Sequence, residues 1–350
     1  MKNINELGQV GRVEKRRMIY GIGLAALMAV AVWFGGGLVF LRTHADVSAP
    51  QARAEEAHTG QWIIEPGRDA NWLHLELIYS SEKQGRGQSM HGSRLSLDQL
   101  RGLGSTQMMS AGTNVQFQLV RDAGTFNCEG WFKNGRGSGH FVFAASPAFV
   151  AELKRRNYEA PTDTQLFRLA LSDTGLGLLD ELQAQGYERP TLDQLVRMGD
   201  HGVSLEYVRA LKAQGYNVQS VDLLTRMVDH GVTVSFIKEL EALGYKGLPV
   251  QTLIRTVDHG VTPDYIRELA SFGHNEMPLE QLTRLVDHGV TAKFIREIEA
   301  AGYGRPSLDQ LVRMQDHGVN ARFIEKMKAR GFNNLTIDEL IKLADHGMNE

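Results

Sequence analysis

The second half of the chain repeats a pattern of apolar and polar positions with a constant period of about 29 residues. In the copy at residues 191–219, the apolar side chains with the spacing of one helical face are Leu192, Leu195, Val196 and Met198. Thr191 and Gln194 form a capping-box start, and Gly202 is placed to end the helix in the left-handed region. A second helix is predicted from Ser204 to Gly215. Each unit therefore holds two helices of about nine or ten residues, which need stacking for stability.

The tripeptide Asp-His-Gly marks the end of the first helix in successive units, and the spacing between consecutive marker histidines never changes. The copies are Asp200-His201-Gly202, Asp229-His230-Gly231, Asp258-His259-Gly260, Asp287-His288-Gly289, Asp316-His317-Gly318 and Asp345-His346-Gly347. A fixed period of this size indicates stacked helical units. An earlier unit at 158–186 has Ser172-Asp173 where later copies have His-Gly, as expected of a first unit that meets another domain. A lone helix from Thr336 to His346 is expected to close the other end of the stack.

Residues 60–150 alternate apolar and polar side chains with a period of two, which predicts β-strands. Leu73, Leu75, Leu77 and Tyr79 share one face, and Val115, Phe117 and Leu119 alternate with glutamines. Asn134-Gly135 predicts a type I′ hairpin, and the segment 96–100 predicts a short capped helix. We expect a compact antiparallel β domain, either a sandwich or a small barrel, that is stable only when it packs on something larger.

The glycine-rich run at residues 135–139 resembles a phosphate-binding loop in composition only. A P-loop needs Gly-Lys-Ser/Thr at the start of a helix, and this run lies between two predicted strands without the Lys. We interpret it as a hairpin turn followed by a bulge, where glycine supplies a positive φ.

The N-terminal part contains an uncharged apolar segment, residues 18–41, which is long enough to span a membrane. Basic residues precede this segment, so the positive-inside rule places the N-terminus in the cytoplasm and the bulk of the chain outside, for a bacterial inner-membrane protein. The alternative is a cleaved signal peptide, with Thr43-His44-Ala45 as the cleavage site. The apolar region of a signal peptide is usually shorter than the segment 18–41, which favours the uncleaved helix. The predicted α+β organisation is a cytoplasmic tail (1–17), a transmembrane helix (18–41), a linker (42–59), an antiparallel β domain (60–150) and an α-helical repeat array (151–350).

The charge and the cysteine content of the chain exclude some classes of partner and of site. The 350-residue chain is 42% hydrophobic and 23% charged, with a net charge of −3. Basic residues alternate with acidic ones, so we expect no nucleic-acid partner. Cys128 is the one cysteine, which excludes an intrachain disulfide and a thiolate zinc finger. Its alternation with Phe126 predicts a buried position on a strand.

The repeated histidines first suggest a metal site. Zinc needs three or four converging ligands, and equivalent residues of stacked units should lie about 10 Å apart, so neighbouring copies cannot share an ion. The better interpretation is structural, because a His near a helix C-terminus faces the negative end of the helix dipole and the following Gly supplies the turn. We therefore predict no metal, no cofactor and no catalytic residue. A ladder of imidazoles that responds to pH is the alternative.

Two further positions repeat. An arginine lies three residues before the marker Asp or its equivalent, at Arg168, Arg197, Arg226, Arg255, Arg284 and Arg313. These arginines predict Arg–Asp pairs within one helix, with a basic stripe that binds an acidic polymer as the alternative. Aromatic side chains follow the second turn glycine, at Tyr187, Tyr216, Tyr245, Tyr303 and Phe332, and are expected to pack between units.

The segments 287–297 (DHGVTAKFIRE) and 301–303 (AGY) resemble helical repeats in bacterial membrane-anchored envelope proteins of unknown function. Similar repeats accompany BlaR/MecR-type membrane metallopeptidases as a C-terminal extracytoplasmic extension. The chain has no His-Glu-x-x-His, so the resemblance implies an accessory or sensor-like ectodomain and no protease activity.

These observations together predict a non-enzymatic membrane protein whose repeat array binds a protein partner. The first alternative is a sensor that acts with a membrane peptidase or a transcription regulator. The second is an envelope enzyme, which would require a pocket joining His74 or His140 to an acidic residue and a nucleophile.

Overall fold

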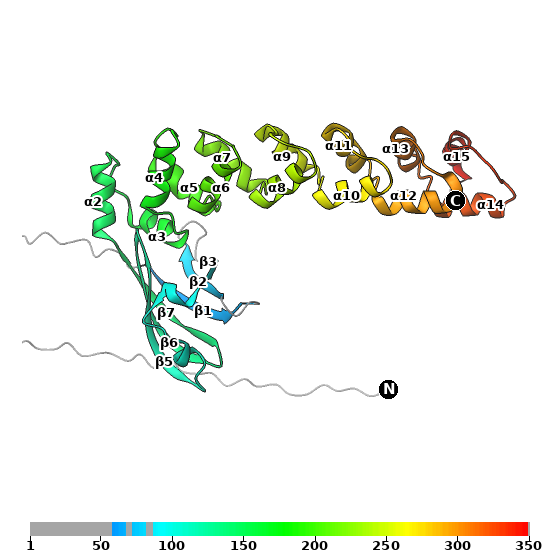
Figure 1. Ribbon diagram of the computed structural model, residues 1–350. Helices are drawn as coiled ribbons and strands as arrows, with labels where there is room; N and C mark the ends of the chain where they lie inside the picture. The colour runs from blue at the N-terminus through cyan, green and yellow to red at the C-terminus, as the bar shows by residue number, and fades with distance from the viewer. Residues whose placement is uncertain (1–57, 68–71, 82–86, 349–350) are drawn as a thin grey trace, which may run out of the picture. The chain divides into compact units, whose positions relative to one another are not determined.

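The computed structural model describes residues 58–67, 72–81 and 87–348 (Figure 1). The predicted cytoplasmic tail, the predicted transmembrane helix and all but the end of the predicted linker lie outside these ranges. Within them, no helix combines the length and apolar character needed to cross a membrane. The predicted α+β class is confirmed, since an antiparallel sheet precedes a long series of helices.

Seven strands form one antiparallel sheet in the order β3-β2-β1-β7-β6-β5-β4. The strands are β1 (Thr59–Pro66), β2 (Leu73–Ser81), β3 (Gly87–Leu95), β4 (Leu100–Arg101), β5 (Thr113–Arg121), β6 (Gly124–Lys133) and β7 (Arg136–Ala145). The prediction of a sandwich or a closed barrel is corrected here, because the described strands make a single sheet that ends at β3 and β4. The short elements η2 (Leu97–Gln99) and α1 (Ser105–Met108) lie between strands, and the capping box at Ser96 confirms the predicted helical turn.

One face of the sheet is buried. The predicted apolar sets are on it, since Leu75, Leu77, Phe117 and Leu119 each expose 3% or less of their surface. Trp62 in β1 is fully buried and its indole N–H donates to the backbone oxygen of Glu129, 3.1 Å away. Alternation along each strand thus separates a core face from an outer face, as the period of two requires.

The β6–β7 hairpin closes through the predicted two-residue turn. Lys133 pairs with Arg136, which leaves Asn134 (φ 50°) and Gly135 (φ 83°) in the left-handed region that a type I′ turn needs. The predicted bulge is wrong, because the pairing of β6 with β7 continues without interruption from this turn to Ala145.

The remaining glycines of that run serve packing instead. A Cβ on Gly137 would lie 2.6 Å from the Phe132 ring, and a Cβ on Gly139 would lie 2.0 Å from the Glu129 carbonyl oxygen. On the paired strand, a Cβ on Gly130 would lie 2.7 Å from the Trp62 ring. Gly137 and Gly130 therefore make room for large rings on the core face of the sheet, and Gly139 allows the backbone of β6 to come close.

After α2 (Pro147–Arg155), the helices alternate between first and second helices of the units. The first helices are α3 (Asp163–Leu171), α5 (Leu192–Asp200), α7 (Val221–Asp229), α9 (Val250–Asp258), α11 (Leu279–Asp287), α13 (Leu308–Asp316) and α15 (Ile337–Leu343). The second helices are α4 (Leu176–Ala184), α6 (Leu205–Ala213), α8 (Val234–Ala242), α10 (Pro263–Ser271), α12 (Ala292–Ile298) and α14 (Ala321–Ala329). The π-helical segments η3 (Glu299–Tyr303) and η4 (Ala344–Met348) extend α12 and α15.

The helices pack in two rows, as Figure 1 lets the reader follow. First helices contact first helices (α3 with α5, α5 with α7), and second helices contact second helices (α6 with α8, α10 with α12). The helix starts follow the predicted capping chemistry: the Thr191 hydroxyl oxygen accepts from the Gln194 N–H at 3.2 Å, and the Gln194 side chain accepts from the Thr191 N–H at 2.9 Å. The predicted two-helix unit is confirmed.

The first unit packs its helix α3 against the buried face of the sheet. Phe167 of α3 stacks on His58 with ring centroids 4.4 Å apart and meets the rings of Tyr79 and Phe143 at 5.0 and 5.4 Å. Phe167 itself is 2% exposed. The array thus supplies the larger partner that the small β domain was expected to need.

The altered marker of this first unit also faces the sheet. Asp173 has a φ of 54°, in the place where later units carry Gly, and its carboxylate lies 3.3 Å from the Arg121 guanidinium at the end of β5. The neighbouring Asp122 accepts from the Leu176 N–H at 2.8 Å and so caps α4. The first unit departs from the repeat because its turn joins the two parts of the chain.

Candidate functional site

The Asp, His and Gly of each marker lie at the C-terminal end of a first helix. Asp200 is the last residue of α5, and His201 is its C-cap residue, whose N–H donates to the Arg197 oxygen at 3.1 Å. Gly202 has a φ of 82°, and its N–H donates to the oxygen of Gly199 at 2.9 Å. The same geometry recurs at the ends of α7, α9, α11 and α13, in the turn that a left-handed glycine allows.

Each marker His from His201 to His317 also contacts the Asp of the next marker, an arrangement that the spacing argument does not predict. His230 Nδ1 lies 2.6 Å from Asp258 Oδ1, and His288 Nδ1 lies 2.7 Å from Asp316 Oδ1. The further pairs of this His–Asp ladder are His201 with Asp229, His259 with Asp287, and His317 with Asp345. A carboxylate only accepts hydrogen bonds, so the imidazole donates through Nδ1.

A signal for the ladder is present in the sequence. In every pair the His and the following Asp are 28 residues apart, one less than the period, because both residues sit at the same helix end. Equivalent backbone positions of stacked helices lie about 10 Å apart, and a His and an Asp side chain that point toward each other are long enough to span this distance. The His–Asp ladder therefore joins consecutive first helices along the array.

Four of the repeated arginines, Arg168, Arg255, Arg284 and Arg313, pair with acids of the next unit, which corrects the predicted pairs within one helix. Arg284 donates to Asp309 at 2.7 Å and Arg313 donates to Asp338 at 2.7 Å, in each case an acid in the first turn of the next first helix. Arg168 instead contacts Asp200 of the next unit. In later units the marker Asp is instead hydrogen-bonded to the His of the preceding marker. Acids in the first turn of a helix also interact favourably with the helix dipole. The charges of these four arginines are thus neutralised by acids of the next unit.

The second helices have a corresponding set of ion pairs. Arg209 lies 2.7 Å from Glu181, and Arg267 lies 2.7 Å from Glu239. The two partners are 28 residues apart in both cases, as in the His–Asp ladder. Hydrogen bonds from Gln185 and then Arg209 lower the pKa of the Glu181 carboxyl. Ionic contacts therefore fix the register between units on both rows of helices.

Tyrosine hydroxyls make a third kind of contact between units. The hydroxyls of Tyr207 and Tyr265 donate to the backbone oxygens of Val232 and Val290 at 2.8 and 2.7 Å. Burial raises the pKa of both phenols. These oxygens belong to the residue after the marker Gly of the next unit, so each hydroxyl satisfies a turn carbonyl.

The aromatic residues after the second turn glycine behave largely as expected. Tyr187 is buried, Tyr216 and Tyr303 pack against the core, and the Tyr245 hydroxyl donates to the Met277 oxygen at 2.6 Å. The prediction is wrong for Phe332, which is 41% exposed.

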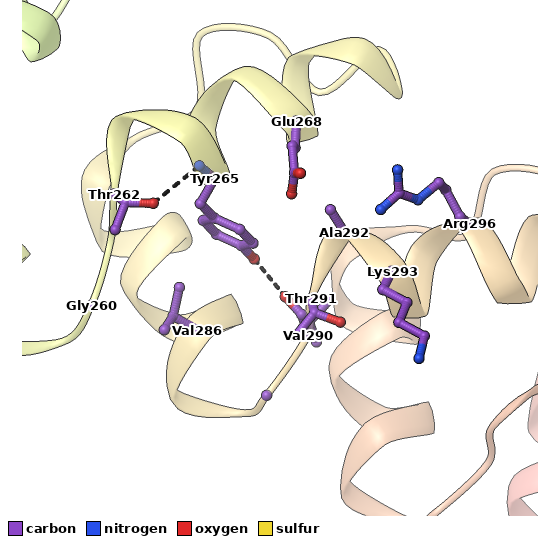
Figure 2. Close-up of a pocket in the computed structure, with 11 residues that line it drawn as sticks. Gly260, Thr262, Tyr265, Glu268, Val286, Val290, Thr291, Ala292, Lys293 and Arg296 are labelled. Atoms are coloured by element: carbon purple, nitrogen blue, oxygen red, sulfur yellow. Dashed lines mark hydrogen bonds between the residues drawn. The ribbon is translucent and has the colours of Figure 1, made fainter.

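A groove of about 460 Å³ lies between α10 and α12 (Figure 2). Its apolar part is formed by the Tyr265 ring, Val286 and Ala292, and its charged part by Glu268, Lys293 and Arg296. The backbone N–H of Tyr265 donates to the capping Thr262 hydroxyl at 3.1 Å, and the Tyr265 hydroxyl donates to the Val290 oxygen, which fixes the far end of the ring. The groove has an ordered apolar wall beside exposed charges of both signs, which suits a protein segment better than a small metabolite.

The marker residues do not assemble a metal site in the described part of the chain. No group of three or more His, Cys, Asp and Glu side chains there is arranged to hold an ion. Each pair of the His–Asp ladder offers one nitrogen and one oxygen, fewer than the three or four ligands that zinc takes.

The two β-domain histidines lie apart from the array. His74 Nε2 is 3.3 Å from Glu76 Oε1 on the same strand. His140 is the cross-strand neighbour of Glu129, and both residues line a hollow on the outer face of the sheet together with Cys128. Cys128 is the one lining residue of that hollow with a thiol or hydroxyl, among the residues described. Burial raises its pKa to about 12, so the reactive thiolate is scarce near neutral pH.

Comparison with protein-family models, with curated proteins and with solved structures finds no match to this chain.

Proposed function

We propose that the chain is a non-enzymatic, single-pass protein of the bacterial inner membrane whose extracytoplasmic repeat array binds a protein partner. The observation that carries the proposal is the groove between α10 and α12, formed by consecutive units of a stack with fixed register. Stacked helical units commonly present such extended surfaces to protein partners. The membrane assignment rests on the apolar segment 18–41 and the basic residues before it.

A preorganised surface favours binding because little freedom is lost when the partner docks. The Tyr265 ring is held by the hydrogen bond from its hydroxyl to the Val290 oxygen, and ion pairs between units limit movement of the second helices. Lys293 is available to pair with an acidic side chain of the partner. Its side chain is 79% exposed, and its ion pair with Glu297 is long, with 3.7 Å between Nζ and Oε1. The groove thus combines a fixed aromatic contact with adaptable charges at its rim.

Site-specific photo-cross-linking in membranes tests the proposal. A photoreactive residue replaces Lys293 at the groove, and the matched control replaces Lys133, an exposed lysine on the β domain. We expect a discrete cross-linked protein from position 293 that is absent from position 133. The substitution Arg296→Glu in the same chain should strongly reduce this product while leaving the melting temperature unchanged.

Equal products from both positions, or a product that Arg296→Glu leaves intact, would contradict the groove as the binding surface. Orientation is tested separately by adding protease to intact spheroplasts. Digestion of the array outside the cell is expected, and complete protection would overturn the proposed topology.

A further inference from the structure

The outer face of the sheet gathers polar side chains of β5, β6 and β7. The pairing of these strands places Gln116 beside Glu129 and Glu129 beside His140. In the adjacent rows, Asn114 lies beside Trp131, and Gln118 lies beside Asn127. We call these seven residues and Ser138, which pairs with Trp131, the outer-face patch.

The outer-face patch is hollowed. Two adjoining depressions of about 560 and 630 Å³ share Gln116, Glu129 and His140 as lining residues. Asn127 lines the first depression and Asn114 the second. Both volumes lie within the range of small-molecule sites. Together they bring polar groups of three strands to one face, with Val142 as an exposed apolar residue in the lining of the first depression.

The hydrogen-bonding groups of the patch are of an unusual kind for a solvated sheet face. Four of them are amides, which donate and accept at once, as sugar hydroxyls do. Gln118 Nε2 donates to Asn127 Oδ1 at 2.8 Å. This contact fixes the orientation of both amides, so the remaining Gln118 oxygen is an acceptor and the Asn127 nitrogen is a donor. A face made of charged side chains would instead favour a ligand of opposite charge.

Trp131 adds a flat apolar surface to the patch. It exposes 49% of its surface, although indole rings are usually buried in soluble domains. Its cross-strand neighbours are the polar residues Asn114 and Ser138, so the ring stands among hydrogen-bonding groups. A ring in this setting can stack on the C–H face of a pyranose while neighbouring amides bind the equatorial hydroxyls.

The charge of the patch distinguishes between ligand classes. Glu129 faces His140 across the strands. Among the described residues that line the hollow, Arg101 is the one Lys or Arg side chain. A phosphate backbone would require clustered Lys and Arg. A peptide strand would add to a sheet edge, whereas this surface is a face. From these contacts, we infer that the outer-face patch binds a neutral oligosaccharide, with Trp131 as the stacking residue.

The inference is independent of the protein partner proposed for the array, because the two surfaces share no residue. The test titrates the purified full-length chain with cellohexaose, chitohexaose and maltohexaose by calorimetry. At least one of these probes should bind with a saturable Kd below about 1 mM. Trp131→Ala should raise that Kd by about tenfold or more, because it removes the ring on which the sugar is proposed to stack.

Trp72→Ala is the matched control, since Trp72 is also an exposed indole, at 39%, and lies outside the patch. It should leave the Kd unchanged. Glu129→Gln provides a second variant, which keeps the shape of the side chain and should weaken binding without altering the melting temperature. Failure of all three probes to bind at about 10 mM, or equal effects of Trp131→Ala and Trp72→Ala, would overturn the inference.

Discussion

His259 Nδ1 lies 2.6 Å from Oδ1 of Asp287, a residue of the next unit in the array. The two residues belong to consecutive copies of the same marker, and each lies at the end of a first helix. The contact turns a local helix terminator into a link between units. It also explains why the period is constant over this part of the array, because a one-residue insertion would displace the next Asp.

The His259–Asp287 pair is expected to contribute modestly to stability. Both side chains are more than a third exposed, so water screens their attraction and a coupling free energy of about 0.2–1 kcal/mol is expected. A double-mutant cycle with His259→Ala and Asp287→Ala in urea measures it. His259→Ala combined with Asp345→Ala, a residue that pairs with His317, should show no coupling. A coupling above about 2 kcal/mol would contradict this description of a solvated pair.

Tyr265→Phe should destabilise the array. The change removes the hydrogen bond to the Val290 oxygen and leaves a carbonyl of a buried residue without that donor, at a cost of about 0.5–1.5 kcal/mol. The chain supplies its own matched site, because Phe236 occupies the equivalent position in the preceding unit. Phe236→Tyr should be tolerated and should raise the denaturation midpoint if its hydroxyl reaches Val261. Unchanged stability of Tyr265→Phe in chemical denaturation would refute the proposed role of the hydroxyl.

Phe167→Ala should separate the β domain from the array. The ring is buried among aromatic side chains of the sheet, and deletion of such a side chain typically costs about 3–5 kcal/mol. Tryptophan fluorescence, to which the buried Trp62 contributes, should then report unfolding of the sheet at lower urea than the helical circular-dichroism signal. Phe332→Ala is the control, since this exposed ring should change stability by less than about 0.5 kcal/mol. Simultaneous unfolding of sheet and helices at the wild-type midpoint would argue against Phe167 as the link.

His91 of β3 should make the contact between the sheet and α3 sensitive to mild acid, because its imidazole forms a hydrogen bond with the backbone of Leu171 at the end of α3. Burial lowers the pKa of the imidazole below its usual 6.5; a hydrogen bond with the Leu171 backbone acts against this, and the nearby Arg121 guanidinium lowers the pKa further. The unfolded chain therefore binds a proton more readily than the folded chain, so stability present above about pH 6.5 is lost as the pH falls toward the folded-state pKa. Melting temperatures from pH 7.5 to 5.0 measure the loss. His91→Gln should flatten the difference between these pH values, and an identical slope in the variant would exclude His91 as its source.

The sequence by itself determined the local backbone of the chain. Capping residues such as Thr191, turn glycines such as Gly202 and the Asn134-Gly135 pair specify conformations through interactions within a few residues, so their effects can be read along the chain. Alternation placed Leu75 and Phe117 on the core face for the same reason. Strand β3 is not predicted, because its sequence GQSMHGSRL is rich in glycine and serine and its pairing depends on β2.

Only the tertiary structure decided which side chains meet. The sequence pattern assigns the marker His and the arginines to their own helix, but the offset between stacked helices brings them to acids of the next unit. The same pattern predicts a bulge within residues 135–139, whereas at Gly137 the glycine is required by packing against the Phe132 ring. The outer-face patch depends on the register of three strands. Such contacts join residues far apart in sequence, and their geometry is set by how whole elements pack, so local patterns do not contain them.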